Sequence, residues 1–181
     1  MELNSALEQL GLLQKKLYAY QTASSSLYLD SVTVAPKDTS EGRGVALGIL
    51  AGESQKLMTA PEIGELLAFL ADQKENLSFV EQRQVEELKR SYDRLSEIPA
   101  DEYMDYAMLT NEASDVWHRA KETSDFTLFA PILEKLVAYN RKFAGYYDSS
   151  KKPYDALLDE YERGADMAFL DTFFETVRER L

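Results

Sequence analysis

Apolar residues recur along almost the whole chain at intervals of three and four positions, which is the pattern of amphipathic helices. In the first segment these residues are Leu3, Leu7, Leu10, Leu13, Leu17 and Tyr20, and they predict a helix that continues toward position 28. Residues 29–36 read instead as irregular or extended, because Pro36 disfavours a helical conformation at the residue before it. No segment alternates as a half-buried strand does. The pattern therefore predicts an all-α chain of about eight helices in one layered domain spanning residues 1–181.

Local signals place the helix starts. Asp38 with Glu41, and Ser78 with Glu81, have the spacing of capping boxes, and Asp166 is expected to cap the last helix. Further starts are expected at Ala60–Pro61, after Ile98–Pro99, and at Ser124 or Asp125. Residues 148–153 read as a loop, followed by a short helix over 154–161 that ends near Gly164.

Three glycines lie on one face of the second predicted helix. Gly44, Gly48 and Gly52 are spaced four residues apart, and each costs about 1 kcal/mol of helix stability relative to alanine. We therefore expect a neighbouring element to approach this face closely.

Composition excludes several classes of protein. The chain has 181 residues, 20 Lys and Arg against 32 Asp and Glu, a net charge of −12, one His and no Cys. The absence of cysteine excludes disulfides and thiolate sites, and one histidine cannot build a His-based catalytic metal centre. The negative charge argues against nucleic acid as a partner, and no apolar run is long enough to span a membrane or to act as a signal peptide. A soluble, cytoplasmic protein is expected.

No familiar catalytic motif is present. The single histidine, His118, lies within a predicted helix and is expected to be a surface or half-buried polar residue. Asp159, Glu160 and Glu162 form the densest acidic cluster near aromatic residues. Such pairs can perform acid–base chemistry when burial separates their pKa values, but a solvated helix face is the simpler interpretation. A hydrolytic or metal site at these three residues remains an alternative.

Several motifs occur in a specific order. They are Asp30, Thr33, Pro36, Glu41 and Arg43; then Ile98-Pro99, Thr110, Trp117, Ala120, Asp125-Phe126, Phe129-Ala130-Pro131 and Leu133; then residues 153–164, PYDALLDEYERG; and finally Leu170-Asp171 with Phe173-Phe174. In this order and spacing the chain resembles the N-terminal part of the carboxypeptidase Taq family, the thermostable-type zinc metallocarboxypeptidases. Leu29 and Ala35 depart from that pattern, which has Trp and Met at these positions.

The resemblance implies the N-terminal portion of a zincin-like metallocarboxypeptidase fold. Its parent would be a homodimer that uses zinc, or another divalent metal, to release C-terminal amino acids from peptides. The family's HExxH motif, third metal ligand and substrate-binding Arg and Tyr lie beyond the PYD segment and are absent here. The 181 residues are therefore expected to hold no metal and no catalytic residue, to be inactive alone, and to form a wall or lid of the substrate cleft. The apolar, periodic segment that reaches Leu181 favours a chain that continues. The alternative is a stand-alone, non-catalytic interaction module derived from the family.

The motif residues have expected structural or cleft-lining roles; they are Asp30, Arg43, Trp117, Tyr154, Asp155, Asp159 and Tyr161. We expect Tyr154 and Tyr161 to pack in the core, Asp155 to cap the short helix near its start, and Asp30 to pair with Arg43. Apolar surfaces that met a catalytic part would be exposed in this chain, so self-association is also expected.

Overall fold

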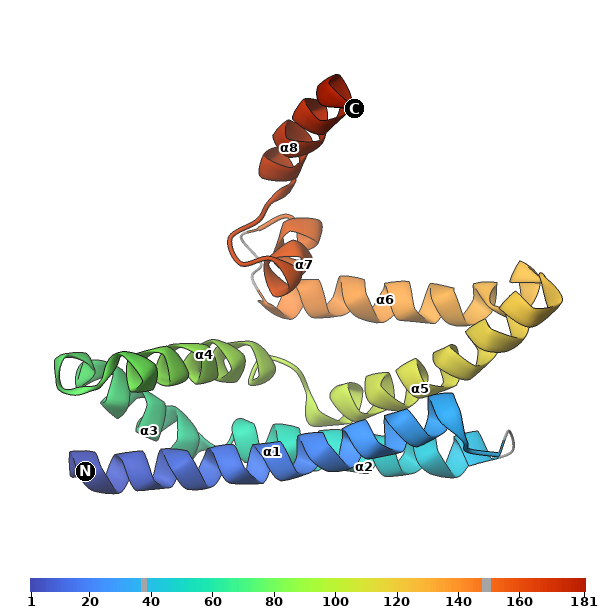
Figure 1. Cartoon of the computed structure of the whole chain (residues 1–181). Coiled ribbons are helices and arrows are strands. Elements are labelled where there is room, and N and C mark those ends of the chain that lie inside the picture. The colour runs from blue at the N-terminus through green and yellow to red at the C-terminus, as the bar shows by residue number, and fades with distance from the viewer. Residues whose placement is uncertain (37–38, 148–150) are drawn as a thin grey trace. The chain divides into compact units, whose positions relative to one another are not determined.

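The computed structural model describes residues 1–36, 39–147 and 151–181. Within these ranges it contains eight α-helices and no strand, which confirms the predicted all-α class (Figure 1). The helices are α1 (Leu3–Thr33), α2 (Ser40–Met58), α3 (Pro61–Asp72), α4 (Phe79–Leu95), α5 (Ala100–Thr123), α6 (Ala130–Tyr147), α7 (Pro153–Tyr161) and α8 (Met167–Arg180). They fall into two compact units, Met1–Leu133 and Glu134–Leu181. None of the helices in the described ranges is both long and apolar enough to cross a membrane.

Two of the predicted helix caps are confirmed by their hydrogen bonds. At the start of α4 the Ser78 side chain accepts from the Glu81 N–H, and the Glu81 carboxylate accepts from the Ser78 N–H at 2.7 Å. The Ser78 hydroxyl also donates to the Glu81 carboxylate at 2.6 Å, and the two hydrogen bonds that this carboxylate accepts, from the hydroxyl and the N–H of Ser78, lower the pKa of Glu81. At the start of α8 the Asp166 carboxylate accepts from the Phe169 N–H at 2.7 Å. The predicted cap at Asp38 lies outside the described residues.

The first helix is longer than predicted. Residues 29–33, expected to be irregular, continue α1 to Thr33. Hydroxyl side chains in this half of α1 donate to carbonyls of the preceding turn, including Ser26 to Thr22 at 2.8 Å and Thr33 to Leu29 at 2.6 Å. Because these hydroxyls are satisfied along the helix itself, the serine- and threonine-rich segment does not have to leave the helical conformation.

The main hydrophobic core lies at one end of the first unit. Its buried side chains come from four helices and the turn before α4; they are Ala6, Leu10, Met58, Leu66, Leu67, Leu70, Leu77 and Val85. Most of them lie on the apolar stripes of the predicted helices. Gln55 of α2 is also buried, and its amide donates to the carbonyls of Leu95 and Ile98, which ties α2 to the junction of α4 and α5.

The other end of the unit is built around α2 and α5, its most extensive helix pair. Gly44, Gly48 and Gly52 are buried on the α2 face that meets α5. A Cβ placed on Gly48 would lie 2.6 Å from Cγ of Met108, so any larger residue at this crossing would force Met108 to shift. The predicted close approach to the glycine face is therefore confirmed, and α5 is the element that makes it.

Candidate functional site

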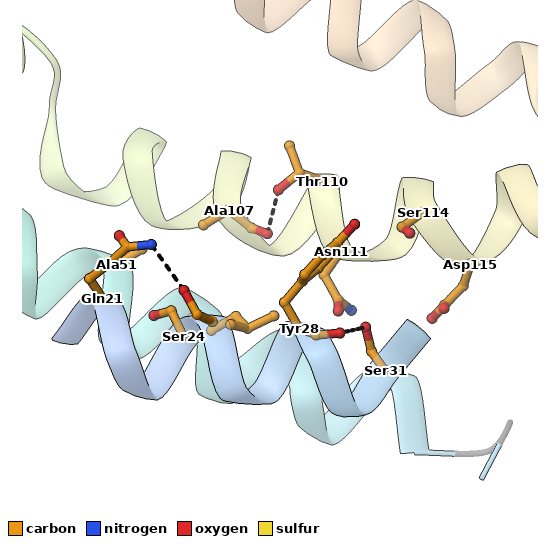
Figure 2. Close-up of a pocket in the computed structure, with 12 residues that line it drawn as sticks. Gln21, Ser24, Tyr28, Ser31, Ala51, Ala107, Thr110, Asn111, Ser114 and Asp115 are labelled. Atoms are coloured by element: carbon orange, nitrogen blue, oxygen red, sulfur yellow. Dashed lines mark hydrogen bonds between the residues drawn. The ribbon is translucent and has the colours of Figure 1, made fainter. Parts of the chain in front are cut away.

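A groove of about 410 Å³ lies in the first unit, where α1 and α5 flank α2 (Figure 2). Both α1 and α5 pack against α2, whereas α1 and α5 do not form a comparable pair with each other. The lining residues of α1 and of α5 recur every three or four positions, so each helix presents one face. They are Gln21, Ser24, Ser25, Tyr28 and Ser31 from α1, Leu47 and Ala51 from α2, and Ala107, Thr110, Asn111, Ser114 and Asp115 from α5.

An ion pair with neighbouring hydrogen bonds lies at one end of the groove lining, at Asn111 and Asp115. The Arg43 side chain, only 8% exposed, lies 3.3 Å from the Asp115 carboxylate and donates through Nε to Oδ1 of Asn111 at 3.2 Å. The Asn111 amide in turn donates to the Ser40 carbonyl at 3.2 Å, and the Ser40 hydroxyl donates to Asp115. These bonds neutralise the charge of Asp115 and fasten the start of α2 to the middle of α5.

The predicted ion pair between Asp30 and Arg43 is wrong. Asp30 lies on an exposed face of α1, because that helix continues past it, while Arg43 projects toward α5 and pairs with Asp115. The motif residue Arg43 therefore joins two helices, α2 and α5, instead of a helix and a loop.

Three hydroxyl groups in the groove make no hydrogen bond to any other described residue. They belong to Ser24 and Tyr28 on α1 and to Ser114 on α5. The other groove hydroxyls are occupied, since Ser31 donates to the Tyr28 carbonyl and Thr110 to the Ala107 carbonyl (Figure 2). The free hydroxyls give both walls of the groove groups that can donate to, or accept from, a ligand.

Trp117 and His118 lie farther along α5. Their rings meet edge to face with centroids 4.8 Å apart, and Nζ of Lys121 lies 4.8 Å from the Trp117 ring. His118 is exposed, as the sequence predicted, and lines a second hollow of about 640 Å³ that shares Ser31 and Asp115 with the groove. Trp117 itself is 43% exposed and lines neither hollow.

The motif residues of α7 serve the turn between α7 and α8. Asp155 does not cap its own helix as predicted, because its carboxylate accepts from the Met167 N–H at 2.8 Å, at the start of α8. Asp159 accepts from the N–H of Gly164, which has a positive φ of 80° and forms the turn where the short helix was expected to end. Asp155 therefore ties the start of α8 to α7, and Asp159, one helical turn later, fixes the turn between the two helices.

The two tyrosines of this segment are not in the core. Tyr154 is 58% exposed and Tyr161 is 84% exposed in the second unit, so the predicted core packing is wrong for this chain. Position 156 faces inward instead, and the small Ala156 is the buried residue of α7. The tyrosine rings project away from the face that α7 presents to its neighbours.

The donor groups of this chain do not fit a hydrolytic metal centre. A zincin site requires two imidazoles and a carboxylate as ligands, and the sequence contains one histidine and no cysteine. Among the residues that the structure describes, no group of three His, Asp or Glu side chains is close enough to hold a metal ion. That includes Asp159, Glu160 and Glu162, the alternative metal site considered from the sequence.

Several residues of the groove were not identified from the sequence. No sequence motif includes Ser24, Ser114 or Asp115, and hydroxyls and carboxylates are common on exposed helix faces. The available signal was the three- and four-residue spacing of small polar residues on two helices. That spacing defines a face without showing that the two faces meet.

Three comparisons agree on the relatives of this chain. The family model of the carboxypeptidase Taq (M32) metallopeptidases matches residues 9–181. Carboxypeptidase 1 of Bacillus subtilis is 34% identical over the whole chain, and thermostable carboxypeptidase 1 of Pyrococcus furiosus is 31% identical over 98% of it. The chain spans about 36% of the length of each of these two relatives.

Solved structures show the same relationship. The crystal structure of BsuCP superposes on 96% of this chain with a TM-score of 0.90 and 35% identity, over 35% of its own length. A Pyrococcus furiosus carboxypeptidase structure superposes on 98% with a TM-score of 0.78 and 30% identity, over 36% of its own length. Sequence and fold thus agree, and the chain belongs to the carboxypeptidase Taq (M32) metallopeptidase family, of which it represents the N-terminal part.

Proposed function

We propose that these 181 residues form one wall, or a lid, of the peptide-binding cleft in a metal-dependent carboxypeptidase. The observation that carries the proposal is that the chain is similar to carboxypeptidases but lacks the residues that a metal centre needs. The chain aligns over its full length with carboxypeptidases, yet it spans about a third of them and has a single histidine. The metal ligands and the groups that hold a substrate carboxylate then belong to sequence outside these residues.

In such an enzyme the metal, when bound, supplies an activated water and polarises the scissile carbonyl. The contribution of this chain is to hold the peptide in place and to limit the access of water to it. The groove between α1 and α5 suits that task, because it is long, partly apolar and lined on both sides with hydroxyl groups. We further propose that the whole enzyme is a cytoplasmic homodimer.

A chimera tests this proposal. The 181 residues replace the matching part of Bacillus subtilis carboxypeptidase 1, and release of the C-terminal residue from an N-blocked dipeptide is measured with added Zn²⁺ or Co²⁺. We expect the chimera to be active and to lose activity on chelation. The isolated chain and the relative without its matching part serve as controls and should both be inactive. Hydrolysis by the isolated chain, or a folded but inactive chimera, would contradict the proposal.

One observation favours the stand-alone interaction module as a second candidate. The second unit exposes large aromatic side chains, and Phe169, Phe173 and Phe174 of α8 are each more than half exposed. In the cleft-wall proposal this surface is covered by the rest of the enzyme, so the isolated chain should self-associate. In a stand-alone module this aromatic surface stays exposed to solvent or binds another protein.

Size-exclusion chromatography with light scattering, over a range of concentrations, separates the two candidates. We expect the isolated chain to associate, and we expect Phe173→Glu to reduce the association. Thr172→Glu adds the same charge at the neighbouring exposed position of α8 and is the matched control. A chain that stays monomeric at all concentrations would favour the stand-alone module.

A further inference from the structure

The groove between α1 and α5 has chemically different sides and floor. Its floor includes Leu47 and Ala51 of α2, which are apolar. The two flanking helices contribute the unoccupied hydroxyls, from Ser24 and Tyr28 on one side and from Ser114 on the other. Hydrogen-bonding groups thus face each other across an apolar base.

The dimensions of the groove indicate a linear ligand. Its α1 lining runs from Gln21 to Ser31 and its α5 lining from Ala107 to Asp115. At about 1.5 Å per helical residue these stretches are about 15 Å and 12 Å long. An extended peptide advances about 3.3 Å per residue, so about four residues span this length. The volume of 410 Å³ also lies in the range of small-ligand sites.

We propose that this groove binds an extended, uncharged peptide segment of about four residues. In an extended chain the backbone N–H and C=O groups point sideways, and successive side chains point to opposite faces. Laid along the groove, such a chain directs its backbone groups at the hydroxyls of both walls. It directs every second side chain at Leu47 and Ala51, where small apolar side chains fit. The inference rests on the proposed function, for which it names the part of the wall that contacts peptide.

The charge of the groove lining is the reason why we propose an uncharged peptide segment as the ligand. Asp115 is the one charged residue that lines the groove among the described positions, and Arg43 and Ser40 already satisfy its carboxylate. A charged ligand side chain would therefore lose water in the groove without gaining an opposite charge. We expect lysine or glutamate in the segment to weaken binding.

The direct test is ¹⁵N–¹H NMR of the isolated 181-residue chain titrated with acetyl-Ala-Ser-Ala-Ala-amide, in which neither terminus is charged. We expect saturable shifts of amide signals at Gln21–Ser31 of α1 and at Ala107–Asp115 of α5. The same peptide with lysine or glutamate in place of serine should bind more weakly. Maltotetraose is the comparison ligand, because hydroxyl-rich grooves also bind sugars. Saturable shifts with the sugar but not the peptide, or shifts confined to other helices, would overturn the proposal.

Two matched variants on α1 sharpen the test. Ser24→Leu fills the groove from its wall, whereas Ser26→Leu adds the same bulk two positions away, at an exposed residue outside the groove. We expect Ser24→Leu to weaken peptide binding by about tenfold or more, and Ser26→Leu to change it by less than about twofold. Equal effects of the two variants would contradict the proposal. If Ser24→Leu does not fold, as judged by circular dichroism, Ser114→Leu obstructs the opposite wall and the shift map of the unmodified chain still decides the question.

Different experimental results would contradict the peptide-binding proposal for the groove and the proposed function. If the chimera is active but the isolated 181-residue chain binds no peptide, the peptide-binding proposal for the groove is contradicted and the proposed function is supported. If the isolated chain binds peptide in the groove but the chimera folds and is inactive, the proposed function is contradicted and peptide binding by the groove is supported.

Discussion

The close crossing of α2 and α5 makes a quantitative prediction about two glycines one helical turn apart. A Cβ on Gly48 would lie 2.6 Å from Cγ and 3.1 Å from Sδ of Met108, far inside contact distance. A Cβ on Gly52 would lie no closer than 3.8 Å to any atom of Met104, an ordinary van der Waals contact. The same substitution to alanine should therefore have opposite effects at the two positions.

The magnitudes follow from two opposing terms. Replacing glycine with alanine within a helix stabilises it by about 0.5–1 kcal/mol. Overpacking a tight contact costs about 1–3 kcal/mol, and Cγ of Met108 cannot move away without a change of its χ1 rotamer. Gly48→Ala should lower the free energy of unfolding by about 1 kcal/mol. Gly52→Ala should raise it by about 0.5–1 kcal/mol.

Urea unfolding followed by tryptophan fluorescence measures this difference. Trp117 is the one tryptophan of the sequence and lies on α5, so its emission reports on the helix that contacts both glycines. In a Met108→Ala background the obstructing Cγ is absent, and Gly48→Ala should become stabilising. If Gly48→Ala stabilises the unmodified chain as much as Gly52→Ala does, the close packing of α2 on α5 is refuted.

Three further predictions concern the polar contacts and the turn between α7 and α8. Asp115→Ala should lower the free energy of unfolding by about 1.5–3 kcal/mol in urea, because the guanidinium of Arg43 stays buried without its carboxylate, and Asp115→Asn should cost less. The native pKa of Glu81 is lowered by hydrogen bonds from Ser78, so its capping contribution is complete above the unfolded pKa and disappears as the pH falls through the native one. The stability difference between the unmodified chain and Glu81→Gln should therefore be larger at pH 7 than at pH 3, and an equal difference at both would contradict it. Gly164→Ala should cost about 1–2 kcal/mol in thermal unfolding, because the φ of 80° strains alanine although its Cβ would meet nothing within 4 Å.

Local features of the fold could be predicted from the sequence. The cap at Ser78 depends on a side chain and a backbone N–H three residues apart, and Asp166 acts over the same distance. Such contacts are contained in a short stretch of sequence, so its residue types are sufficient evidence. The glycine face of α2 was informative for a related reason, since three costly residues on one face require compensation from elsewhere.

The groove could not be predicted, because it depends on which helices meet. Arg43 and its partner Asp115 are on α2 and α5, and no local pattern favours Asp115 over the nearer Asp30. The predicted core packing of the two α7 tyrosines was wrong for a similar reason. Tyr154 and Tyr161 have core-like spacing, but burial requires a neighbouring surface, and the described residues of the second unit provide none for them.

The glycine face of α2 has a consequence for the chain as it is synthesised. About 60 residues separate Gly48 from Met108, the side chain that covers it. At about 5–20 residues per second, a ribosome needs several seconds to add them. During that interval α2 carries the entropic cost of its glycines without the packing that offsets it. The second helix therefore gains the packing that offsets its glycines only after the fifth has been synthesised.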